Sequence, residues 1–280
     1  MAKDNLLGEM QRFEQQLREE EKSMGTIQKY LRDVSEFVQW LNERQLTKEL
    51  VTIWKDSLLA RGLKPTTING KLASICSFLS LLGREDCKVK PLKIQRNVFR
   101  DQHREITKED YEALLKVARE NGDERLELLM ETICATGIRV SEVKYIMMEA
   151  ITAGRAEIAL KGKIRVILLP AKLCRKLSKY VKKRRIQSGE VFITRSGRGL
   201  SRKQIWAEMK KLCKKAGVES TKVFPHNLRH LFARCFYKVS HDLIQLADVL
   251  GHSRVETTRI YLKSTGKEHS RTLERLQLIS

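Results

Sequence analysis

The stretch from 225 to 263 constrains the fold of this chain more than any other part of its sequence. It opens with a helical pattern in which His226 and Arg229, three positions apart, share one face. The apolar periodicity then stops at Gly251, a residue common just past a helix end, and His252 follows at this break. The pattern predicts helices that meet at a sharp turn, with polar side chains on either side of it.

A further helix is expected directly after this turn. Ser253 and Glu256 have the spacing of a capping box, which marks a helix start. Tyr261 would lie on this helix, at helical spacing from Val255 and Thr258. Such a tyrosine taken alone is more typical of a buried core position than of a reactive group, so the surrounding pattern must decide its role.

The pieces in this order resemble the C-terminal signature of the tyrosine recombinases, the phage integrase family. That signature is H-x-L-R-H, then L-G-H, then a tyrosine, and the chain carries HNLRH, LGH and Tyr261 in that order. Upstream, the stretch ATGIRVSEV resembles the family's box for a first catalytic arginine, here Arg139, with Glu142 as a supporting carboxylate. The resemblance covers nearly the whole chain and is closest from Arg139 onward.

The resemblance implies a catalytic role for each of these residues. Tyr261 attacks the scissile phosphate of DNA and leaves a 3′-phosphotyrosyl link, while Arg139 and Arg229 hold the nonbridging oxygens. His226 accepts the tyrosine proton, and His252 hydrogen-bonds the phosphate. A lysine on a β-hairpin protonates the departing 5′-oxygen.

The hairpin lysine is assigned to the segment AEIALKGKIRVILLP, which predicts strands over 157–160 and 165–168. The family pattern resembles G-K-G-N-K-x-R. In this chain Leu160 replaces the first glycine and the turn is shorter. Lys161 aligns best with the general acid, and Lys163 remains an alternative.

The chemistry of these side chains suits phosphoryl transfer without a metal ion or ATP. A tyrosine hydroxyl, with a pKa near about 10, needs a base or a positive field before it attacks. Arginine stays charged and can hold two phosphate oxygens, and fixed cations lower the barrier to transfer. His226, His230 and Cys235 do not have the spacing of a zinc site. We therefore expect no metal and no cofactor.

The charge balance favours a polyanionic partner. Lys and Arg number 55 against 34 Asp and Glu, a net charge of +21. Between Lys161 and Arg185 eleven residues are basic and none is acidic, a run that repels itself unless a polyanion lies against it. A basic soluble protein without such a partner is the alternative.

The compartment is expected to be the cytoplasm, with no membrane association. The six cysteines include no C-x-x-C pair, which favours free thiols in a reducing environment. The N-terminus lacks the features of a secretory signal, and no apolar run approaches the roughly 20 residues of a membrane span.

The length of 280 residues predicts two domains of a mainly α fold with a small β-hairpin. Residues 1–83 are expected to form a helical, SAM-like core-binding domain, and 84–103 a basic linker around Pro91. Residues 104–280 are expected to form an α+β catalytic domain that ends in an interaction helix. The helices are predicted near 5–22, 27–41, 47–60, 65–82, 108–119, 123–136 and 201–215, with a short strand over 190–194.

Candidate DNA contacts lie in three parts of the chain, where phosphate contacts add affinity without sequence preference. For each residue alone, an ordinary solvated surface position is the alternative. The candidates are Lys64, Thr66, Thr67, Asn69 and Lys71 in the first domain, Lys93, Arg96 and Arg100 in the linker, and Lys163 and Arg165 on the hairpin.

The resemblance implies a site-specific recombinase acting on double-stranded DNA with paired inverted half-sites, as a tetramer. Because the first helix begins near residue 5, we expect no separate arm-binding domain, as in Xer-like resolvases and short mobile-element recombinases. The reaction would integrate or excise a mobile element or resolve replicon dimers. Type IB topoisomerase-like relaxation and catalytically silent DNA binding are the alternatives.

The C-terminal helix is the expected contact between subunits. Leu273, Leu276 and Ile279 recur at three-residue spacing, and so short a helix must dock to be stable. In the family it docks on a neighbour around the tetramer. Docking on its own domain is the alternative.

Overall fold

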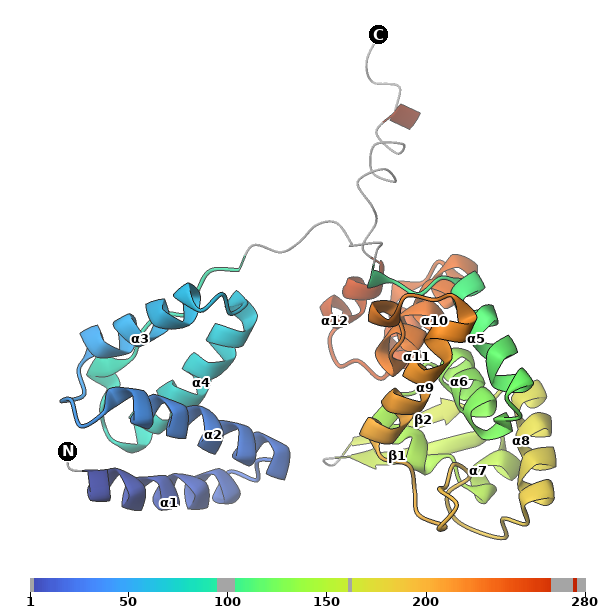
Figure 1. Ribbon diagram of the computed structural model, residues 1–280, viewed down its shortest axis with the longest axis horizontal. Coiled ribbons are helices and arrows are strands. Elements are labelled where there is room, and N and C mark those ends of the chain that lie inside the picture. The colour runs from blue at the N-terminus through green and yellow to red at the C-terminus, as the bar shows by residue number, and fades with distance from the viewer. Residues whose placement is uncertain (1–2, 95–103, 161–162, 263–273, 276–280) are drawn as a thin grey trace. The chain divides into compact units, whose positions relative to one another are not determined.

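The computed structural model describes residues 3–94, 104–160, 163–262 and 274–275, and the chain forms two compact units, Met1–Arg96 and Asn97–Ser280 (Figure 1). The fold is mainly helical with a two-stranded sheet, as the sequence predicted. No helix within the described ranges is both long and apolar enough to cross a bilayer.

The first unit contains the four predicted helices. Ser23 and Thr47 cap the second and third helices by accepting the backbone N–H groups three residues on. Aromatic side chains fill the core, where Phe13 meets the ring of Phe78 edge to face. The helices are α1 (Lys3–Glu19), α2 (Met24–Leu41), α3 (Lys48–Ala60) and α4 (Pro65–Leu81), followed by the 3₁₀ turn η1 (Glu85–Cys87).

The start of the predicted linker belongs to this first unit. Cys87 is fully buried among the helices, and Val89 is buried beside it. The side chain of Asn69 donates to the carbonyl of Leu92 at 2.9 Å and accepts from its N–H at 2.8 Å. The prediction that the linker begins at 84 is therefore corrected: charge and Pro91 suggested a loose segment, but buried apolar side chains and backbone hydrogen bonds hold it.

The second unit carries helices around one hairpin. Its elements are α5 (Lys108–Glu120), α6 (Glu124–Thr136), η3 (Val140–Tyr145), α7 (Met148–Ala153), β1 (Arg155–Leu160), β2 (Lys163–Leu168), α8 (Ala171–Arg184), α9 (Arg202–Ala216), η4 (Ser220–Lys222), α10 (Pro225–Ser240), α11 (Leu243–Leu250), α12 (Val255–Arg259) and η5 (Ile260–Leu262). The strands pair antiparallel from Arg155 opposite Leu168 to Leu160 opposite Lys163. The predicted strand over 190–194 is wrong: only isolated bridges form there, from Glu190 to Met147 and from Ile193 to Gly199, because the chain turns between them.

Helix α10 is the central element of this unit, and the candidate site is built around it. It packs against α6 and α11, and Leu228 joins the main core through its buried side chain. Its other residues tie down the start of the unit: Asn227 donates to the carbonyl of Arg104 at 2.7 Å, and Arg234 pairs with Glu105 at 2.5 Å. Arg229 of α10 contacts the last carbonyls of α6 and α11, so the ends of these helices lie at the first turns of α10.

The helix after the turn at Gly251 begins differently from the prediction. Helix α12 has Arg254 as its N-cap, without a side-chain cap, so the capping box of Ser253 and Glu256 does not form. Instead, the Nδ1 of His252 lies 2.8 Å from the Oγ1 of Thr258, which ties the turn to the last part of the helix.

Candidate active site

Arg229 is the buried centre of the site. Its side chain comes from α10 and is only 2% exposed. Its Nη1 donates to the carbonyl of Gly137 at the end of α6, and its Nη2 donates to the carbonyl of Leu250 at the end of α11, at 2.7 Å. Carbonyls at helix C-termini carry partial negative charge, so they stabilise a buried guanidinium at the point where two helices end.

His252 is held in one tautomer by its two neighbours. The Nη2 of Arg229 lies 3.0 Å from the Nε2 of His252, and because a guanidinium can only donate, Nε2 accepts. The proton is therefore on Nδ1, which donates to Thr258. Burial, followed by the charges of Arg229 and Arg139, lowers the pKa of His252 to about 4. The ring is neutral at pH 7.

Tyr261 lies against the same arginine. It is 4% exposed and belongs to the short turn η5. The Nε of Arg229 donates to its hydroxyl at 3.4 Å. Its ring stacks on His252 with an interplanar angle of 9° and meets His230 edge to face, with ring centroids 4.4 Å apart. The hydroxyl therefore lies in a positive field among imidazole rings.

His226 and His230 line the α10 side of Tyr261. They are one helical turn apart, with ring centroids 4.5 Å apart, and the ring of His226 lies 6.0 Å from that of Tyr261. Burial lowers the pKa of His226, and Arg229 lowers it further. Burial also lowers the pKa of His230, to about 3. Both rings are neutral at pH 7, which is the state in which a histidine accepts a proton.

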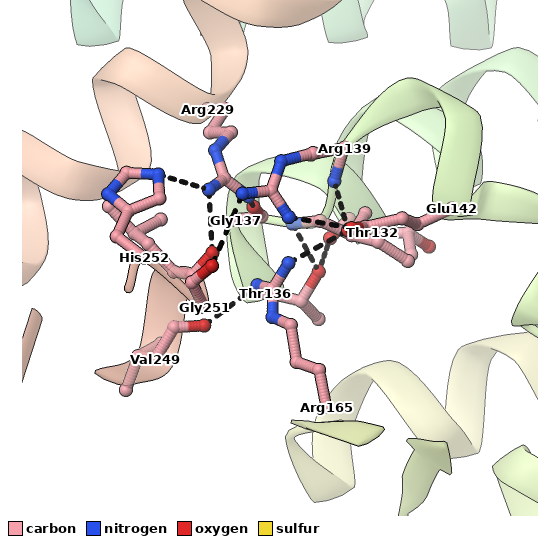
Figure 2. A network of polar contacts seen from close by, with 12 residues as sticks. Thr132, Thr136, Gly137, Arg139, Glu142, Arg165, Arg229, Val249, Gly251 and His252 are labelled. Atoms are coloured by element: carbon pink, nitrogen blue, oxygen red, sulfur yellow. Dashed lines mark hydrogen bonds and ion pairs between the residues drawn. The ribbon is translucent and has the colours of Figure 1, made fainter. Parts of the chain in front are cut away.

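Arg139 and Glu142 form the opposite side of the site (Figure 2). The Nη1 of Arg139 donates to Glu142 Oε1 at 2.7 Å, and its backbone N–H donates to Oε2 at 3.0 Å. Its Nη2 lies 3.4 Å from the carbonyl of Gly251. Glu142 is buried, whereas the side chain of Arg139 is still 40% exposed. Buried Glu142 therefore orients Arg139, and the exposed part of the Arg139 side chain is accessible to a phosphate from outside the protein.

The structure brings six of the predicted site residues together. They are Arg139, Glu142, His226, Arg229, His252 and Tyr261. Lys161 lies outside the described residues, and Lys163 is placed only as the first residue of β2. Among the described residues, no group of three His, Cys, Asp or Glu side chains is arranged to hold a metal ion.

The side chains of three predicted DNA contacts have partners inside the protein, and their role in DNA binding stays a prediction. Asn69 holds the backbone of Leu92, and Lys71 is largely buried and paired with Glu36. Arg165 is 12% exposed and paired with Glu142 at 2.8 Å. By contrast, the side chains around the start of α4 and after η1 are exposed, and Arg96 and Arg100 lie outside the described residues. The exposed candidates are Lys64, Thr66, Thr67 and Lys93.

Sequence reasoning missed the positions of His230, Thr258 and Arg165 in this site. His230 follows His226 by four residues, so the helical period alone places both rings on one face. Arg165 alternates with Ile164 and Val166, and period-two alternation was the signal that it points inward. Because Arg165 is charged, it was predicted to be a candidate DNA contact instead.

Two family models match this chain. The model of the phage integrase family matches residues 104–268, and that of the phage integrase N-terminal SAM-like domain matches residues 10–86. The chain belongs to the phage integrase family. Its members are tyrosine recombinases, enzymes that cleave and rejoin DNA.

Similar curated proteins and solved structures are site-specific recombinases. Tyrosine recombinase XerA of Thermococcus kodakarensis is 28% identical over 282 residues, which cover 96% of this chain and 95% of that protein. Tyrosine recombinase XerD of Halalkalibacterium halodurans is 29% identical over 266 residues, covering 87% and 88%.

Two solved structures share the fold at low identity. XerH bound to a palindromic difH substrate gives a TM-score of 0.71 at 19% identity, covering 90% of this chain and 80% of that one. A lambda integrase tetramer bound to a Holliday junction gives 0.72 at 17% identity, covering 91% and 76%.

Proposed function

We propose that this protein is a site-specific DNA recombinase whose nucleophile is Tyr261. The observation that carries the proposal is the position of the tyrosine hydroxyl, 3.4 Å from the Nε of Arg229 and enclosed by the rings of His230 and His252. A buried hydroxyl beside a cation and neutral imidazoles is suited to lose its proton during attack. The protein acts on DNA in the cytoplasm, to integrate or excise a mobile element or to resolve replicon dimers.

Cleavage follows from these groups in one balanced step. The Tyr261 oxygen bonds to phosphorus while its proton passes to neutral His226. The bond from phosphorus to the 5′-oxygen breaks, and a lysine supplies the proton that this oxygen needs. Attack by a 5′-hydroxyl of another strand reverses the step. The phosphotyrosyl link conserves the bond's free energy, so no ATP is consumed.

The arginines stabilise the charge that develops during this transfer. Arg139 is exposed and can reach a nonbridging oxygen, while Glu142 fixes its direction. Arg229 holds the other oxygen from beneath, and His252 hydrogen-bonds the phosphate. Removal of such a preorganised donor typically costs about a hundredfold to a thousandfold in rate. Alanine at either arginine should slow cleavage on this scale and leave DNA binding largely intact, because many other cations contact the backbone.

The substrate is double-stranded DNA with paired inverted half-sites, on which four protomers assemble. The net charge of +21 supports a nucleic-acid partner, and lambda integrase has been solved as a tetramer on a Holliday junction. The C-terminal segment, which lies largely outside the described residues, would dock on a neighbouring protomer. Deletion of 268–280 should keep binding to one half-site and abolish cooperative filling of the full site; persistence of tetramers would place the segment on its own subunit.

The test starts from capture of the target. Genomic DNA trapped covalently on the protein is sequenced, and the site is rebuilt as a nicked suicide substrate. Tyr261→Phe should bind this DNA and form no covalent band on a denaturing gel. Tyr237→Phe is the matched control, because Tyr237 packs against the same small core but has no proposed role. A covalent band from Tyr261→Phe contradicts the assignment.

The same assay separates the alternatives. A topoisomerase would relax supercoils without bringing two sites together, and a silent DNA-binding protein would trap no DNA. A substrate with sulfur at the 5′-bridging position needs little protonation of its leaving group. This substrate should rescue Lys161→Ala and not Lys163→Ala, and the opposite pattern would exchange the two lysines.

A further inference from the structure

Arg165 lies beneath the candidate site and takes part in none of the proposed steps. It comes from the middle of β2, where its neighbours Ile164 and Val166 face outward and are 77% and 46% exposed. The pleat of the strand therefore turns Arg165 inward, and its side chain is only 12% exposed. Burial of an arginine costs free energy unless its N–H donors have partners, so the partners of this side chain indicate why it is buried here.

Arg165 shares one carboxylate with Arg139. Its Nη1 donates to Glu142 Oε2 at 2.8 Å, while the Nη1 of Arg139 donates to the other oxygen, Oε1, at 2.7 Å (Figure 2). The buried carboxylate thus lies between two guanidinium groups. Because Arg165 occupies one oxygen, it limits the rotation of Glu142 and fixes the direction from which the more exposed Arg139 is held.

Arg165 also holds the turn that carries His252. The last carbonyls of α11 and its cap, residues 249–251, each accept from a different arginine. Arg165 takes the first at 2.8 Å, Arg229 the second at 2.7 Å and Arg139 the third at 3.4 Å. The side chain of Arg165 packs directly beneath Gly251, where a Cβ would lie 2.6 Å from its Nε. Any residue other than glycine at position 251 would displace the side chain of Arg165.

We propose that Arg165 is a positioning residue, which sets Arg139 through Glu142 and His252 through the 249–251 turn, without touching the phosphate itself. The inference rests on the proposed function, in which these two side chains bind the scissile phosphate. Catalytic side chains must be held by surrounding contacts to be effective, and displacement of about 1 Å can cost about a hundredfold in rate. A single arginine that contacts both supports is placed to provide this.

The test compares Arg165→Met with Arg155→Met in the full-length protein. Arg155 lies on the neighbouring strand and is exposed, and its one ion pair within the described residues is a long 3.6 Å contact with Glu157, so its loss removes the same charge without the buried contacts. We expect Arg165→Met to slow single-turnover cleavage by about a hundredfold, while the Kd for the DNA site changes little. Arg165→Lys should recover part of the rate, since one ammonium can reach Glu142 or Val249 but cannot bridge both.

A second readout does not depend on cleavage. Arg165 is one of the charges, with Arg229, Arg139 and His226, that lower the pKa of His252. The pKa of His252, followed by NMR of its ring, should rise in Arg165→Met and stay unchanged in Arg155→Met.

Each outcome bears on the inference. If wild type cleaves and folded Arg165→Met cleaves at the same rate, or loses DNA binding in parallel, Arg165 does not position the site. If Arg165→Met fails to fold, Arg165→Lys decides by the same comparison of cleavage rate and Kd. If wild-type protein does not cleave, the proposed function is wrong, and the His252 titration still shows whether the charge of Arg165 lies close to His252.

Discussion

Gly251→Ala should destabilise the second unit far more than the same change at Gly217. Both glycines cap a helix in the left-handed region, with φ of +63° and +64°. A Cβ costs about 1 kcal/mol in this conformation at either position. At Gly217 the Cβ would meet nothing, whereas at Gly251 it would collide with Arg165. The difference between the two variants isolates that collision.

The size of the difference follows from what Arg165 must give up. If its side chain moves aside, the hydrogen bonds to Glu142 and to the carbonyl of Val249 are lost or lengthened. Hydrogen bonds that involve a charged group contribute about 1.5–3 kcal/mol each. Because the chain can relax around the new methyl group, we expect about 2–4 kcal/mol beyond the loss in Gly217→Ala.

Hydrogen exchange measured by mass spectrometry can follow the second unit separately. The protected amides of α6 should exchange about 30- to 700-fold faster in Gly251→Ala than in Gly217→Ala, since 1.4 kcal/mol corresponds to a factor of ten. Combining Gly251→Ala with Arg165→Ala should cost less than the sum of the two changes, because the collision is then absent. Equal exchange in the two single variants would show that Arg165 does not pack beneath this turn.

Three further changes have defined outcomes. Glu142→Gln removes the buried charge that lies between the guanidinium groups of Arg139 and Arg165, and should lower the free energy of unfolding by about 3 kcal/mol, measured by calorimetry. Because the pKa of His252 is about 4 in the folded protein against 6.5 when unfolded, the unfolded chain takes up the proton first, so stability should fall as pH drops from 6.5 towards 4. His252→Gln should show a smaller fall in Tm over that range. Asn69→Ala should release the backbone at Leu92 and increase proteolysis there, with exposed Thr66→Ala unchanged as the control.

The helices were predictable because their signals are local. The apolar period and the side-chain caps act within a few residues, and the helix start predicted near 108 is confirmed, with a capping box between Thr107 and Asp110. The prediction at Ser253 was wrong, because the N-cap of α12 is Arg254, one residue later. There, the contact between His252 and Thr258 replaces a local cap.

The residues of the candidate site were predictable from the order and spacing of the sequence motifs, but the contacts that hold them in place were not. The motif identifies Arg229 and Tyr261, and the structure places them in contact. That Glu142 serves two arginines depends on the hairpin meeting η3, a tertiary contact without a local signal. The buried end of the first unit also lacked a local signal, since charged residues surround Cys87 and Val89 in the sequence.

The hydrogen bonds of Arg229 determine how readily its side chain binds an anion when no DNA is present. A guanidinium has five N–H donors, and in the described part of the chain four of them are directed at Tyr261, Gly137, Leu250 and His252. A stray inorganic phosphate would have to displace these groups, and it brings no other contacts to compensate. A DNA backbone brings many cation contacts along its length and can drive the same exchange of partners. Arg229 is therefore poorly receptive to small anions in the resting site, whereas Arg139, with a side chain that is 40% exposed, stays accessible to them.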